Sequence, residues 1–207
     1  MTHFLKANRV RYAELHTFPL DTDMLAYYDT IIVVVRDPLA RLISAYNFQH
    51  PDGEDPLPES NRFLYLCFNN LTDLGERIFE DSDCGQIGRS DSTTHMGLGY
   101  CSYVGGYGVR SSLLEHKNLY VIRADRCEAD SVHAAEAAII GNAAASSANK
   151  ASLTSYKMPQ IYVHKRKRGM STALSPRARE NLVRWLQVSG ETQLFSDILR
   201  AGKSSPS

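Results

Sequence analysis

The chain has 207 residues, enough for one ordinary domain with a hydrophobic core. Its 43% hydrophobic and 22% charged residues are typical of a globular protein, and no run of about 18 apolar residues encodes a membrane span. Lysine plus arginine and aspartate plus glutamate number 23 each, so the net charge is zero. The overall charge therefore does not favour a polyanionic partner such as nucleic acid.

The first third of the chain contains the clearest pattern. A weak alternation predicts a short strand over residues 9–15, and a short helical piece follows around 24–28. Five β-branched residues from Ile31 to Val35 predict a strand buried on both faces, as in a parallel sheet. Asp37 is a good N-cap and Pro38 suits the first helical position, so a helix should run from there to about Gln49.

The rest of the chain predicts more helices and one more clear strand. We expect one or two helices over 61–80, an irregular surface loop over 81–108, a helix near 111–116, a strand over 118–125, a helix over 128–140, a linker over 142–155, an extended arm over 161–169, a helix from 175–176, and a last helix over 191–199. This order predicts a single α/β domain over residues 1–203, with a parallel sheet flanked by helices in three layers, and a disordered tail at 204–207.

The four cysteines allow two interpretations. No C-x-x-C pair occurs, so the cysteine spacing fits no zinc pattern. An even count permits two disulfides in an oxidising compartment or four thiols in the cytosol. If disulfides form, we expect Cys84 and Cys101 to be the bonded pair, because both lie in a region rich in glycine and serine.

The turn after the predicted strand carries residues that can bind an anion. From Arg36 the sequence reads R-D-P-x-x-R-x-x-S-x-Y, with Ser44 two turns into the predicted helix. Ligands of open α/β sheets bind at the carboxyl ends of the strands. Arginine can hold a phosphate with two parallel hydrogen bonds, and serine adds a hydroxyl donor. The alternative is an ordinary capped helix, with Arg36 and Arg41 merely solvated.

This motif resembles the 3′-phosphate-binding element of sulfotransferases, which use 3′-phosphoadenosine 5′-phosphosulfate (PAPS) as sulfuryl donor. The resemblance assigns the donor's 3′-phosphate to Arg36 and Ser44. It is strongest to carbohydrate sulfotransferases of the uronosyl 2-O type, and it covers roughly residues 10–50 and 118–200. It implies a sulfotransferase fold related to the P-loop kinases, a glycan acceptor and no metal cofactor.

The resemblance also suggests a catalytic base. In the uronosyl 2-O enzymes a histidine just after the equivalent first strand looks like the base, and it corresponds here to His16. A histidine that titrates near neutrality can accept the proton of a sugar hydroxyl. The alternative is an ordinary histidine at the surface or the edge of the core, since the chain has seven.

A basic run, Lys165, Arg166, Lys167 and Arg168, precedes Gly169. In the 2-O enzymes the matching segment ends in basic residues near the donor, so the resemblance assigns this run to donor binding. Two alternatives are a solvated charge run and a nucleic-acid or nuclear-localisation patch. The neutral net charge and the lack of a nucleic-acid-binding module weigh against the second alternative.

One family element is not found. Sulfotransferases hold the 5′-phosphosulfate with a glycine-rich loop at the start of a helix, and nothing here resembles G-x-x-x-x-G-K-S/T or its sulfotransferase variant. We therefore expect either a truncated chain whose N-terminal phosphate-loop part is missing, or a protein that has lost this site.

The leading interpretation is a PAPS-dependent sulfotransferase that acts on a carbohydrate hydroxyl. Its alternatives are a sulfotransferase for a small alcohol or a protein tyrosine, a non-catalytic module that binds the 3′-phosphoadenosine group or a partner, and a nucleotide kinase relative. By resemblance the enzyme would lie in the Golgi membrane, on the lumenal side. We find neither a signal peptide nor a membrane anchor in the sequence, so association with the membrane would need an anchor absent from this chain.

Overall fold

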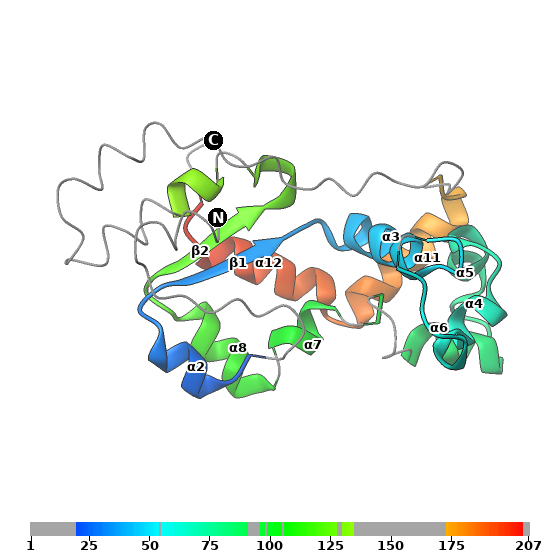
Figure 1. The fold of residues 1–207 in the computed structure, drawn as a ribbon, viewed down its shortest axis with the longest axis horizontal. Coiled ribbons are helices and arrows are strands. Elements are labelled where there is room, and N and C mark those ends of the chain that lie inside the picture. Colours follow the sequence, from blue (N-terminus) through cyan, green and yellow to red (C-terminus); the bar gives the residue numbers. More distant parts are fainter. Residues whose placement is uncertain are drawn as a thin grey trace. The chain divides into compact units, whose positions relative to one another are not determined.

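The computed structural model describes residues 20–53, 55–90, 96–97, 99–104, 106–127, 130–134 and 173–204 (Figure 1). The chain divides into two compact units. The first, called the sheet unit below, comprises Met1–Arg36, Tyr103–Val163 and Ser196–Ser207. The second, called the helical unit, comprises Asp37–Ser102 and His164–Phe195.

The sheet unit contains a small parallel sheet with helices beside it. Its elements are α2 (Thr22–Tyr27), β1 (Ile31–Val35), α8 (Tyr107–Leu114), β2 (Leu119–Arg123), the short 3₁₀ helix η2 (Ala124–Arg126) and the last part of α12 (Glu191–Ala201). β1 and β2 pair in parallel, from Ile31 opposite Leu119 to Val35 opposite Arg123. The predicted mixed α/β class with a parallel sheet is therefore confirmed in this coarse form.

The sequence predicts that the strand Ile31–Val35 is buried on both faces, and this prediction is wrong. Val35 is buried, but the side chain of Val34 is 60% exposed, so β1 is not buried on both faces. β2 is the more buried strand, with Leu119, Val121 and Ile122 in the core. The reason is position, because β2 lies between β1 and a further backbone pairing with Lys203, whose N–H donates to the Leu119 carbonyl at 2.8 Å.

The end of α12 packs closely against β2. Gly202 follows this helix, and a Cβ at that position would collide with the Val121 side chain. Glycine therefore allows the backbone to come close enough for the Lys203 pairing. An ion pair between Arg110 of α8 and Asp197 of α12 also fixes this end of the helix.

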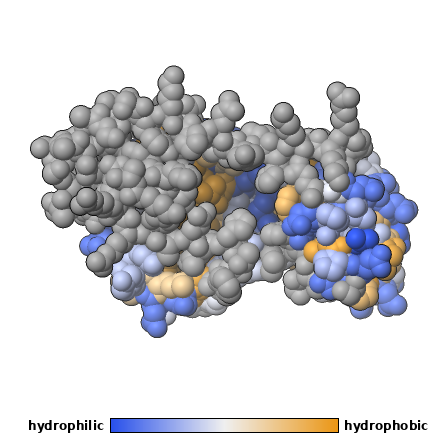
Figure 2. Space-filling model, in the orientation of Figure 1, coloured by the Kyte–Doolittle hydropathy of each residue, from blue (hydrophilic) through white to orange (hydrophobic). Residues whose placement is uncertain are grey.

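The helical unit is built from short helices around one apolar cluster. Its elements are α3 (Pro38–Gln49), the 3₁₀ helix η1 (Glu59–Asn61), α4 (Phe63–Cys67), α5 (Leu71–Arg77), α6 (Asp83–Ser90), most of α7 (Tyr100–Val104), α11 (Pro176–Val188) and the start of α12. The most deeply buried members of its core are Leu42, Tyr46, Leu64, Phe68, Leu74, Ile78, Met96 and Leu182. Figure 2 shows hydrophilic residues over most of the visible face of this unit, with hydrophobic residues between them.

Side-chain caps set the start of the helices that the sequence predicted best. Asp37 accepts the Ala40 N–H at 2.8 Å at the start of α3, and Ser175 accepts the Ala178 N–H at 3.1 Å at the start of α11. Each of these helices has a proline in its first turn. Such signals are local, which is why the sequence predicts both starts correctly.

The predicted surface loop over residues 81–108 is wrong. α6 and α7 lie in this region, and α8 begins at its end. Two of the glycines that suggested a loop, Gly85 and Gly88, lie inside α6. A Cβ at Gly88 of α6 would lie 3.0 Å from a Leu74 methyl and 3.3 Å from the Phe68 ring, so glycine lets α6 pack closely on the core.

The expected pairing of Cys84 with Cys101 is also wrong. Cys84 in α6 forms a disulfide with Cys67 at the end of α4, with 5.3 Å between their Cα atoms. The packing of α6 beside α4 decides the pairing. Cys101 is reduced, and its thiol donates to the Ser189 carbonyl at 3.6 Å.

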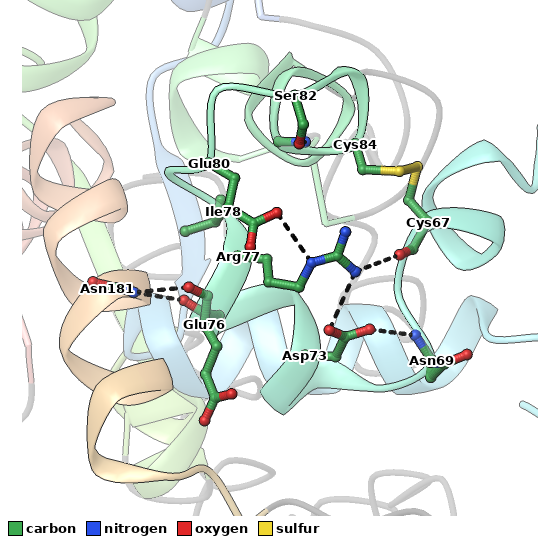
Figure 3. A network of polar contacts seen from close by, with 12 residues as sticks. Cys67, Asn69, Asp73, Glu76, Arg77, Ile78, Glu80, Ser82, Cys84 and Asn181 are labelled. Atoms are coloured by element: carbon green, nitrogen blue, oxygen red, sulfur yellow. Dashed lines mark hydrogen bonds and ion pairs between the residues drawn. A yellow bond between two sulfur atoms is a disulfide. The ribbon is translucent and has the colours of Figure 1, made fainter.

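A polar network surrounds this disulfide (Figure 3). Arg77 donates to the Cys67 carbonyl at 3.2 Å and pairs with Asp73 at 3.3 Å and Glu80 at 3.1 Å. Hydrogen bonds to Glu80 and Asp73 raise the pKa of the Arg77 guanidinium. Asn181 of α11 donates to the Gly75 carbonyl of α5 at 2.9 Å. The disulfide thus lies among contacts that tie α4, α5, α6 and α11 together.

We expect the disulfide to stabilise the helical unit. Replacing both Cys67 and Cys84 by serine should lower the free energy of unfolding by about 3 kcal/mol, because the unfolded chain regains the entropy of an open loop. Urea unfolding monitored by circular dichroism measures this difference. Cys127→Ser, which removes a reduced thiol, should leave the urea concentration at the unfolding midpoint nearly unchanged. Equal midpoints for all three proteins would contradict the pairing.

Candidate anion-binding site

Two arginines lie at the carboxyl ends of the two strands, at one edge of the sheet. β1 and β2 are parallel, so their carboxyl ends meet at the same edge. Arg123 ends β2 opposite Val35, and half-buried Arg36 comes directly after Val35. Adjacent strands lie about 4.8 Å apart, so the backbones of the two arginines are close to each other. This edge is where ligands bind in open α/β sheets.

Asp130 fixes the arginine that ends β2. It lies in a helical stretch over residues 130–134, and its side chain is completely buried. One carboxylate oxygen accepts the Arg123 backbone N–H at 2.9 Å and lies 3.8 Å from the Arg123 Nε atom. The other oxygen lies 4.0 Å from the Nε of Arg126. A single buried carboxylate thus accepts a hydrogen bond from the Arg123 backbone and lies within ion-pair distance of two guanidinium groups, while the buried Nε of Arg123 has no hydrogen-bond partner in the part of the chain that the structure describes.

The charges at this edge are unequally exposed. The side chains of Arg123 and Arg126 are 32% and 28% exposed, whereas that of Asp130 is fully buried. Asp125 lies 4.0 Å from the Arg123 Nε, with 78% of its side chain in solvent. The buried carboxylate attracts both cations electrostatically, and each cation keeps part of its side chain in solvent. Asp125 and Asp130 balance the charges of Arg123 and Arg126, so a phosphate at this edge would compete with these carboxylates for the guanidinium donors.

The other half of the R-D-P motif begins the helical unit. Ser44 lies in the second turn of α3 with an exposed side chain. Arg41 is not merely solvated. Its Nη2 donates to the Met96 carbonyl at 3.5 Å, and its guanidinium lies over the Tyr100 ring at 5.4 Å. Arg41 therefore packs within the helical unit.

The predicted site residues fall into three groups. Arg36 belongs to the sheet unit and Ser44 to the helical unit, and each is described within its own unit. His16 lies outside the described residues, and so does the basic run Lys165, Arg166, Lys167 and Arg168. The assignments of these five residues stay predictions.

Sequence reasoning missed Arg123, Arg126 and Asp130. Arg126 and Asp130 stand four residues apart, a spacing that brings side chains together on a helix, so one signal was present. The burial of Asp130 could not be read from the sequence, because it depends on how this stretch packs against the sheet.

No protein-family model, curated protein or solved structure matches the chain. In the part of the chain that the structure describes, no three histidine, cysteine, aspartate or glutamate residues gather as metal ligands. None of the helices described there is long and apolar enough to cross a membrane.

The role of Asp130 can be measured as stability. Asp130→Asn keeps the shape of the side chain but removes its charge beside two arginines. It should lower the free energy of unfolding by about 1–3 kcal/mol, because the charged hydrogen bond to the Arg123 N–H is weakened. Chemical denaturation measures the loss. Asp125→Asn is the matched control and should change stability by about 0.5 kcal/mol at most, since its carboxylate is exposed. Equal losses would show that burial of Asp130 has no energetic role.

Proposed function

We propose that the chain is a PAPS-dependent sulfotransferase acting on a carbohydrate hydroxyl, with Arg36 as a contact for the 3′-phosphate of the donor. The observation that supports this most is the position of Arg36. It follows a parallel strand, at the sheet edge where Arg123 ends the neighbouring strand, and directly before the capped start of α3. The proposal takes Ser44 from the sequence motif alone.

The proposed recognition is electrostatic. A 3′-phosphate carries close to two negative charges, and a guanidinium can offer it two parallel N–H donors. Arg36 is half-buried, so part of its hydration is already removed, and its hydrogen bonds to an anion are stronger than those of a fully exposed arginine. Adenosine 3′,5′-bisphosphate, the product of the reaction, would bind for the same reason.

The proposed reaction is sulfuryl transfer. The acceptor hydroxyl oxygen forms a bond to sulfur, the bond from sulfur to the bridging phosphate oxygen breaks, and the hydroxyl proton passes to a general base. We propose His16 as that base, and Lys165–Arg168 as cations near the donor, both on the resemblance alone. We likewise propose the three-layer sulfotransferase fold as the architecture of the complete domain.

The disulfide supports the proposed compartment. Disulfides persist in the secretory lumen and are rare in the cytosol. The Cys67–Cys84 bond is therefore consistent with a protein of the Golgi lumen, where carbohydrate sulfotransferases act.

A second candidate function is a non-catalytic module that binds 3′-phosphoadenosine compounds. The sequence favours it in one respect, because no glycine-rich phosphate loop occurs among its residues. Both candidates require selective binding of a 3′-phosphate, and only the enzyme transfers sulfate.

We expect the chain to bind adenosine 3′,5′-bisphosphate more tightly than adenosine 5′-monophosphate. Arg36→Ala should weaken binding of the bisphosphate about 10- to 150-fold, since a hydrogen bond to a charged group contributes about 1.5–3 kcal/mol. The affinity of Arg36→Lys for the bisphosphate should lie between those of the parent protein and Arg36→Ala, because lysine keeps the charge but loses the paired donors. Isothermal titration calorimetry measures the affinity of the parent protein for both nucleotides and the affinity of each variant for the bisphosphate. Arg179→Ala, which removes an exposed arginine of α11, is the charge-matched control. Equal affinity for both nucleotides would refute the assignment.

Transfer of radiolabelled sulfate from PAPS to a panel of glycans separates the two candidate functions. Turnover supports the enzyme, and His16→Ala should then lower kcat by about 100- to 10,000-fold with little change in nucleotide affinity. Selective nucleotide binding without turnover supports the non-catalytic module. A His16→Ala protein with unchanged kcat would remove this residue from the mechanism.

A further inference from the structure

One asparagine of the chain lies in a glycosylation sequence. Asn70-Leu71-Thr72 fits the pattern N-x-S/T, in which the middle residue is not proline. It is the only such match among the nine asparagines of the sequence, so at most one N-linked glycan is encoded in these residues. The pattern alone is short and often occurs by chance, which is why its structural setting matters.

The structure places Asn70 where a glycan can be attached. It lies in the turn between α4 and α5, and its side chain is exposed. Its Oδ1 accepts the Asp73 N–H at 2.9 Å and thereby caps α5. Among the described residues, no hydrogen bond uses its Nδ2, the atom that would carry the sugar. A glycan on Nδ2 therefore leaves the Oδ1 cap intact.

The backbone around Asn70 is held by its neighbours. The Asp73 carboxylate accepts the Asn69 N–H at 3.0 Å and pairs with Arg77, which in turn donates to the Cys67 carbonyl (Figure 3). This network fixes the turn, and none of its contacts involves the Nδ2 of Asn70. An attached glycan would extend into solvent and displace none of these contacts.

A second, independent observation concerns the compartment. Cys67 lies three residues before Asn70 in the sequence and forms the disulfide with Cys84. Disulfide formation requires an oxidising compartment, and the secretory lumen of eukaryotic cells is also where N-linked glycans are added. The bond and the sequence pattern thus point to the same compartment.

We propose that Asn70 is an N-glycosylation site of this protein. The donor is a lipid-diphosphate-linked oligosaccharide. A bond forms between the Asn70 Nδ2 and C1 of the first sugar, the bond from C1 to the diphosphate oxygen breaks, and the amide proton leaves with the lipid diphosphate. This inference does not rest on the sulfotransferase proposal, because it uses only the helical unit and the disulfide.

The experiment expresses the 207-residue chain in eukaryotic cells behind a cleavable signal sequence. Peptide N-glycosidase F, which releases N-linked glycans and converts their asparagine to aspartate, should produce one discrete gain in electrophoretic mobility. Tandem mass spectrometry of the digest should then find aspartate at position 70 and asparagine at position 69. Unmodified Asn70 in protein that has lost its signal sequence would overturn the proposal.

Matched variants separate glycosylation from folding. Thr72→Ala removes the sequence pattern but keeps the Asn70 cap, so the mobility change should disappear. Thr72→Ser keeps the pattern and should keep the glycan. Asn70→Asp should abolish the glycan while preserving the cap, since aspartate is an equally good N-cap. Asn69→Gln, at the adjacent exposed asparagine, should have no effect. A mobility change that survives Thr72→Ala or Asn70→Asp would also overturn the proposal.

Discussion

The parallel pairing of β1 with β2 brings two strand ends, and with them Arg36 and Arg123, to one edge of the sheet. In an antiparallel pair the ends would lie at opposite edges, and the two arginines would be separated by the length of a strand. The pairing also decides burial, because β2 is covered on its other side by the Lys203 segment while β1 keeps Val34 in solvent. The proposed anion site therefore requires the parallel direction of the two strands, because only this direction brings Arg36 and Arg123 to the same edge.

Asp130 brings a negative charge into the interior beside the charged edge of the sheet. A fully buried carboxylate would be strongly unfavourable by itself, and here it accepts a backbone N–H and lies near two guanidinium groups. The hydrogen bond from the Arg123 N–H and the attraction of the two cations offset the cost of burying this anion. These contacts keep two positive charges at the carboxyl edge of the sheet. This is the physical basis for proposing the sheet edge as the place of nucleotide binding.

The helical unit relies on different forces. Its helices are short, and isolated helices of this length are unstable in water, so packing and covalent linkage must hold them. Close approach at Gly88, the Cys67–Cys84 disulfide and the Arg77 network supply that support within one region. Asn70, which caps α5, lies in the same region with an exposed side chain. A disulfide and a glycan would both be added in the oxidising secretory lumen, in agreement with the proposed lumenal location.

The sequence by itself determined the elements whose signals are local. The β-branched run predicts β1, and Asp37-Pro38 and Ser175-Pro176 predict the starts of α3 and α11, because caps and first-turn prolines act within a few residues. The roles of Arg36 and Ser44 rest on a sequence motif alone and stay predictions. Only the tertiary structure decided that Cys84 bonds to Cys67, that glycines 85 and 88 lie inside a helix, and that Asp130 is buried beside Arg123. Each of these depends on which distant segments pack together, and that choice minimises the free energy of the whole fold rather than of any short stretch of sequence.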